Sequence, residues 1–123
     1  MSDILDLAAR RRALIVLCES AGLVDIARDL GTKPNDDPGA LRKTLLTVRH
    51  IATGIHAFIG HEHAGRPAPN LDAMAALALR IEHDAMAAIV VCDRVIAERH
   101  ERNAVKIDQE LAKSARHYVG RAQ

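Results

Sequence analysis

The chain has 123 residues, of which 49% are hydrophobic and 27% are charged, a balance typical of a globular protein rather than of a disordered tail. The formal net charge is +1 and there is one Phe, one Tyr and no Trp, so the charge balance and the lack of stacking side chains argue against nucleic acid as a partner. No apolar run is long enough to span a bilayer, and the start, MSDILD, does not resemble a signal peptide. We therefore expect one cytoplasmic domain over residues 1–123, without a membrane partner.

Apolar residues recur at steps of three and four through most of the chain, which predicts helices. Four helices are expected, over residues 3–30, 38–64, 70–100 and 104–119. Gly31 ends the first helix, and Asp37 followed by Pro38 supplies an N-cap and a first helical residue for the second. The apolar stripe shifts around residues 99–103, which predicts a short break between the third and fourth helices, with one long kinked helix as the alternative. Gly22 is either a small packing residue within the first helix or a point that divides it in two.

No segment shows the alternating pattern of a strand, so the predicted fold is all-α, an antiparallel four-helix bundle. Its core is expected to consist of Leu, Ile, Val and Ala side chains. Cys18 and Cys92 both lie in apolar runs, which predicts buried free thiols rather than a disulfide or a metal pair. Apolar surface left over on the first helix is an expected route to a homodimer.

The second predicted helix carries the functional signal, because four of the seven histidines lie in it. Its apolar residues form one stripe, and at about 100° per residue His50 points away from the centre of that stripe. Lys43, Gly54, Ala57 and His61 share the side of His50. A solvent-facing imidazole surrounded by a cation and two very small residues is suited to close approach by a partner protein.

His50, Gly54 and Gly60 stand at positions i, i+4 and i+10, with Ile59 before the second glycine. Over about a dozen residues this spacing resembles the phosphorylated helix of histidine phosphotransfer (HPt) domains, which are four-helix bundles of about this length. The resemblance implies a signalling phosphocarrier of bacterial two-component regulation. His50 would be the phosphoacceptor, a receiver domain or histidine kinase the partner, and no cofactor would be needed. The family's usual Lys, three residues after the histidine, is Thr53 here.

A non-catalytic helical interaction protein is the alternative, in two specific forms, and whether the chain is an enzyme stays open. In the first form a metal binds the cluster at residues 56–63, although His56, His61 and His63 are not spaced to meet one ion on a single helix. A helix-turn-helix DNA-binding protein is the second form, with its positively charged residues on one helix facing DNA. Those residues are Arg42, Lys43 and Arg49. The expected turn of about seven residues is longer than that motif normally has.

Overall fold

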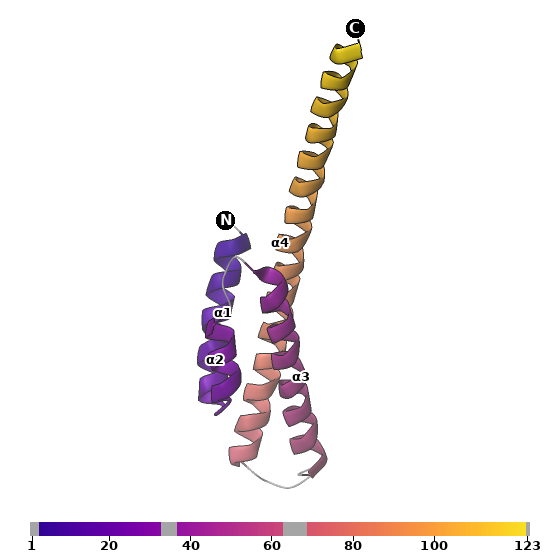
Figure 1. The fold of residues 1–123 in the computed structure, drawn as a ribbon. Helices are drawn as coiled ribbons and strands as arrows, with labels where there is room; N and C mark the ends of the chain where they lie inside the picture. The colour runs from indigo at the N-terminus through magenta and orange to yellow at the C-terminus, as the bar shows by residue number, and fades with distance from the viewer. Residues whose placement is uncertain (1–2, 33–36, 63–68, 123) are drawn as a thin grey trace.

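The computed structural model describes residues 3–32, 37–62 and 69–122, with side chains described as far as Arg116. Within these ranges it contains four helices and no strand (Figure 1). They are α1 (Asp3–Ser20), α2 (Val24–Thr32), α3 (Pro38–Glu62) and α4 (Pro69–Ala122). The predicted all-α helical bundle is therefore confirmed. The division of the chain into helices differs from the prediction at two places, near Gly22 and near Arg99.

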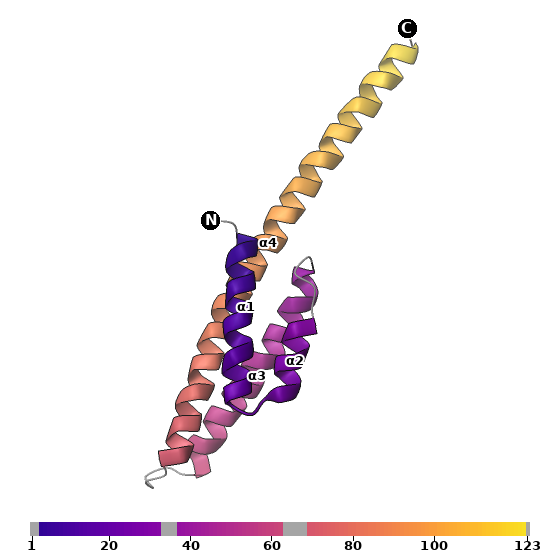
Figure 2. The same ribbon diagram turned by 90° about the vertical axis from the view of Figure 1, so that its left-hand side faces the viewer.

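Successive helices alternate in direction, so that α1 and α2 form an antiparallel pair beside the α3–α4 pair (Figure 2). The most extensive packing is between α3 and α4, and α1 packs on both α2 and α4. One hydrophobic core joins all four helices. Its fully buried side chains include Leu14, Cys18, Leu30, Leu45, Ala52, Ile81, Ala85, Ala88 and Cys92. Alanines on both sides of the α3–α4 seam leave smooth surfaces, which suits close helix packing.

The predicted helix over residues 3–30 is wrong, because the chain turns at Gly22 and makes two helices. The N–H of Leu23 donates to the carbonyl of Cys18 at 2.8 Å, and the N–H of Gly22 donates to the carbonyl of Glu19 at 3.0 Å. Gly22 has φ of +78°, in the left-handed region. This pattern is a Schellman motif, which ends a helix by satisfying its last carbonyls and favours glycine at that position.

Replacing Gly22 with alanine is expected to lower the free energy of unfolding by about 1 to 2 kcal/mol, because a Cβ disfavours the left-handed conformation. Chemical denaturation of the variant measures this change. Gly54→Ala is the matched control: Gly54 lies in a regular helical turn, where alanine is favoured by about 1 kcal/mol. Equal effects of the two substitutions would contradict the role given to Gly22.

The predicted break at residues 99–103 is absent, so the expected helices 70–100 and 104–119 are one continuous helix, α4. The segment RHERN contains neither Gly nor Pro, and Glu and Arg are good helix formers. The inward stripe of α4 ends at Val95 because the other helices end there, and every side chain from His100 to Arg116 is exposed. The fourth helix of the bundle is therefore α2.

The predicted N-cap of α3 is confirmed by its hydrogen bonds. Asp37 Oδ1 accepts a hydrogen bond of 3.0 Å from the N–H of Ala40, and the carbonyl of Asp37 accepts one of 3.1 Å from Leu41. Asp37 is thus the N-cap and Pro38 the first helical residue. The expected end of this helix, at residue 64, lies outside the described residues, which continue from residue 69.

Candidate functional site

His50 lies on the outward face of α3, and its side chain is exposed. The opposite face of the helix packs into the core through Leu41, Leu45, Val48, Ala52 and Ile59. The four residues predicted to share its side of the helix are all exposed as well, namely Lys43, Gly54, Ala57 and His61. Helical periodicity therefore places these five residues along one solvent-facing strip, which we call the His50 face.

A shallow surface hollow surrounds His50. It is lined by Leu46, Thr47, Arg49, His50 and Thr53. Arg49 is exposed, and it lines the same hollow as His50. The spacing argument missed Arg49 as a residue of this site. Its position next to His50 in the sequence was the available signal.

Neither glycine of the motif is required by packing between helices. A Cβ built on Gly54 or on Gly60 would find no atom within 4 Å outside the local helix. Glycine in a helix interior costs about 1 kcal/mol relative to alanine, and the fold recovers none of that cost through a close helix contact at these two positions. The bare backbone at Gly54 is open to solvent one turn after His50.

Two cations precede the imidazole along the helix. Lys43 is seven residues before His50, which corresponds to about 10 Å along the axis, and Arg49 is adjacent in the sequence. Thr53, at the position of the family's Lys, is exposed and lines the hollow. A Thr hydroxyl can donate a hydrogen bond to a phosphoryl oxygen but carries no positive charge.

The histidines of the metal alternative are not gathered in the part of the chain that the structure describes. His56 and His61 are exposed on α3, and His63 lies outside the described residues. Among the described residues, no group of three His, Cys, Asp or Glu side chains is arranged to hold a metal ion. Two imidazoles five residues apart on one helix do not face a common ion.

Two of the three basic residues of the DNA-binding alternative remain exposed, and the third is engaged within the bundle. Arg42 Nε lies 2.6 Å from Asp93 Oδ1, in an ion pair that ties α3 to α4. Lys43 and Arg49 lie on the outer side of α3. The α1–α2 connection is a turn at Gly22, and the two helices run antiparallel (Figure 2).

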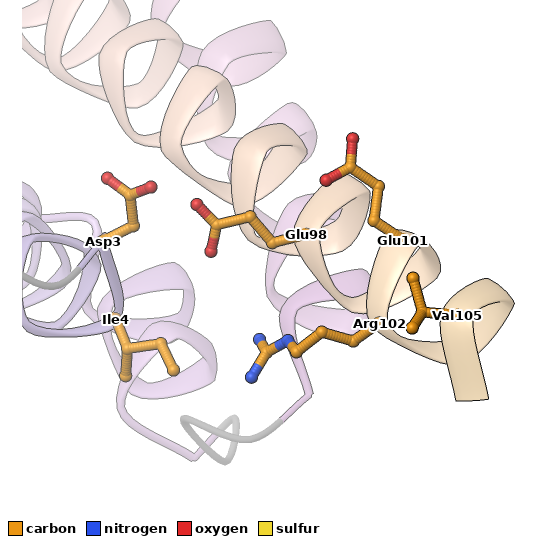
Figure 3. Close-up of a pocket in the computed structure, with 6 residues that line it drawn as sticks. All are labelled: Asp3, Ile4, Glu98, Glu101, Arg102 and Val105. Carbon is orange, nitrogen blue, oxygen red and sulfur yellow. The ribbon is translucent and has the colours of Figure 1, made fainter. Parts of the chain in front are cut away.

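A second hollow lies where α1 begins beside α4 (Figure 3). Asp3 and Glu98 turn their carboxylates toward one another across it, and Glu101 lines it one turn farther along α4. Arg94 Nη2 is 3.9 Å from Asp3 Oδ1, so a guanidinium group partly balances the acidic side. This open acidic hollow has no arrangement of groups that suggests a ligand.

No protein-family model, no curated protein and no solved structure significantly matches this chain. Within the described ranges, no helix has an apolar stretch of the length and purity needed to cross a membrane.

Proposed function

We propose that the chain is a signalling phosphocarrier similar to HPt domains, with His50 as the phosphoacceptor. The observation that carries this proposal is the His50 face: an exposed imidazole followed one turn later by a glycine that no neighbouring helix requires. A receiver domain must bring its phosphoaspartate into line with the imidazole, so the surface around His50 has to be open and flat. Gly54 and Ala57 provide that surface.

The proposed transfer needs little from this chain beyond position and charge. The unprotonated ring nitrogen of His50 attacks the phosphorus of the receiver's acyl phosphate; a nitrogen–phosphorus bond forms and the bond to the aspartate oxygen breaks. The aspartate leaves as a carboxylate, and the proton on the other ring nitrogen can pass to water. The receiver supplies the Mg²⁺ ion. The reverse sequence hands the phosphoryl group to a second receiver.

Arg49 and Lys43 are the groups of this chain that would compensate the phosphoryl charge. Arg49 lines the same hollow as His50. Guanidinium groups bind phosphoryl oxygens well, because their N–H donors match the geometry of those oxygens. Thr53 stands where the family pattern has a Lys. Arg49 would take the role of that Lys from the position directly before His50.

Incubation with a receiver domain labelled on its aspartate tests the proposal directly. Wild-type protein is expected to take up an acid-labile label, and His50→Gln is expected to take up none, because glutamine has no nucleophilic ring nitrogen. His56→Gln is the matched control, since His56 is also exposed on α3 but lies away from the His50 face. An unlabelled wild type, or equal labelling of the His50 variant, would reject the phosphocarrier.

A second variant separates docking from chemistry. Gly54→Leu adds a bulky side chain into open space, so the fold is retained while the approach of a receiver is hindered. Transfer is expected to slow at least about tenfold, since misplacement of reacting atoms by 1 Å can cost about a hundredfold. Far-UV circular dichroism checks that the variant is folded.

A helical interaction protein is the second candidate function. The observation that favours it is the part of α4 beyond Val95, which leaves the bundle with large apolar side chains exposed. The His50 experiment distinguishes the two candidates, because an interaction protein needs no phosphoryl group.

A further inference from the structure

Helix α4 has apolar side chains on two opposite faces. One face is buried against the other helices through Ile81, Ala85, Ala88, Cys92 and Val95. On the opposite face three large apolar residues lie on the part of α4 within the bundle and two lie beyond it, at steps of seven, four, seventeen and four, and all of them are exposed. These residues are Leu79, Met86, Val90, Ile107 and Leu111. Exposed alanines fill the intervals at positions 76, 97, 104 and 115. We call this set the outer stripe.

The outer stripe continues past the end of the bundle, with Ala97 and Ala104 between Val90 and Ile107, and with Asp93 and His100 at the remaining positions of that interval. Its first half lies on the part of α4 that packs in the bundle, and its second half lies on the extension, residues 99–122 (Figure 1). The spacing follows a heptad, which is the signature of a helix that pairs with another helix along its length. Val90, Ile107 and Leu111 are 56%, 59% and 63% exposed, so among the described residues nothing covers this face.

We propose that the outer stripe docks against the same stripe of a second copy, with the two α4 helices antiparallel. The pairing is symmetric about the point between Glu98 and Arg99. Val90 and Ile107 lie equally far before and after that point, and so do Met86 and Leu111. Val90 and Met86 on the bundle half therefore meet Ile107 and Leu111 on the extension of the other copy.

Length and area also fit a second copy. The bundle half of the stripe, residues 76–97, is nearly as long as the extension, so the two halves can pair along most of their length. Forty residues of stripe extend about 60 Å, and a helix is about 10 Å wide. The footprint of roughly 600 Å² is comparable with the ~800 Å² that each partner buries in a stable interface.

Charges at the edge of the stripe favour the antiparallel direction. On one edge the bundle half carries Arg80 and Arg94, while the extension carries Glu101 and Asp108. Antiparallel pairing brings Arg94 of each copy beside Glu101 of the other. A parallel pair would instead place Asp93 opposite Asp93 in one layer, and two like charges would face each other there.

Sedimentation of the full chain tests the pairing. Wild-type protein is expected at about twice the 13.4 kDa mass of one chain, and Leu111→Glu or Val90→Glu is expected to raise the dissociation constant roughly a hundredfold or more. Phe58→Glu is the control, because Phe58 is 65% exposed on α3, away from the stripe. A monomeric wild type, or Glu variants that dimerise as wild type does, would overturn the proposal.

Disulfide trapping tests the register. Val90→Cys mixed with Ile107→Cys is expected to give a cross-linked dimer, and neither variant alone is expected to do so, because residues 90 and 107 are about 25 Å apart along one helix. Wild type gives the background, since Cys18 and Cys92 are fully buried. Cross-linking of either variant with itself would overturn the antiparallel register. His50 lies outside the stripe, so these results are independent of the phosphocarrier proposal.

Discussion

Replacing Leu45 with alanine is expected to lower the free energy of unfolding by about 3 kcal/mol, one of the two largest effects on stability that we predict. The Leu45 side chain is 0% exposed and belongs to the single core that joins the four helices. Truncation removes its methyl groups from that core and leaves a cavity that the neighbouring helices fill only partly. Because domains of this size are stable by only about 5 to 15 kcal/mol, the midpoint of chemical denaturation should shift clearly.

The next residue provides the control for this prediction. Leu46 is exposed on the other side of the same helical turn, at 36%. Leu46→Ala changes the same atoms in the same helix, and its effect is expected to stay within about 1 kcal/mol. If the two leucines were equally costly to truncate, the core would not lie where the structure places it.

Raising the pH from 9 to 11 is expected to destabilise the protein through its two thiols. Desolvation by burial raises the pKa of Cys18 from 9.0 to about 11. Burial also raises the pKa of Cys92 to about 11; the neighbouring Asp93 adds to this increase, and Arg42 opposes it. Below pH 9 both thiols are protonated in the folded and unfolded chains, so their contribution to stability is complete. Between pH 9 and pH 11 only the unfolded chain loses these protons, and that contribution is lost.

A shift of about two pKa units corresponds to about 2 to 3 kcal/mol for each thiol, which is a substantial loss against a total stability of about 5 to 15 kcal/mol. Unfolding by urea, measured at several pH values, follows the change. The variant with alanine at both Cys18 and Cys92 corrects for the other groups that titrate in this range. Its free energy of unfolding should fall less between pH 9 and 11 than that of wild type. Parallel curves for the two proteins would show that the thiols are not protected by the fold.

The inward faces of the helices could be predicted from the sequence, because burial follows helical periodicity. Leu41, Leu45, Val48 and Ala52 share one stripe of α3, and all four are buried. The N-cap at Asp37 could also be predicted, since it depends only on local chemistry. Both features require no knowledge of how distant segments pack.

The two errors in dividing the chain have different physical causes. A glycine inside an apolar pattern, such as Gly22, fits both a packing contact and a C-cap, and only its φ distinguishes the two. The change of stripe near Arg99 resembles the end of a helix in the sequence. It marks instead the end of the neighbouring helices, a property of the tertiary structure that the local sequence does not contain.

The sequence predicts which residues of the candidate site share one side of α3, but it does not predict the shape of the surface that they form. Periodicity placed His50, Lys43 and Gly54 on one side of α3, and the three are exposed. The hollow that joins Arg49 to His50 depends on side-chain positions that spacing alone does not give. The outer stripe of α4 was overlooked because the inward seam of the same helix explained most of its apolar residues. Leu79, Met86 and Val90 were the available signal.

Because α4 is one continuous helix, a change of its angle within the bundle would also move the part of α4 that extends beyond the bundle. The extension beyond the bundle has 24 residues, at 99–122, and is therefore about 36 Å long. A tilt of about 10° in the α3–α4 seam would displace the far end of that helix by about 6 Å. Ala52, Ala85 and Ala88 are buried at that seam, so any change in their packing would move the far end of α4 farther than the seam itself.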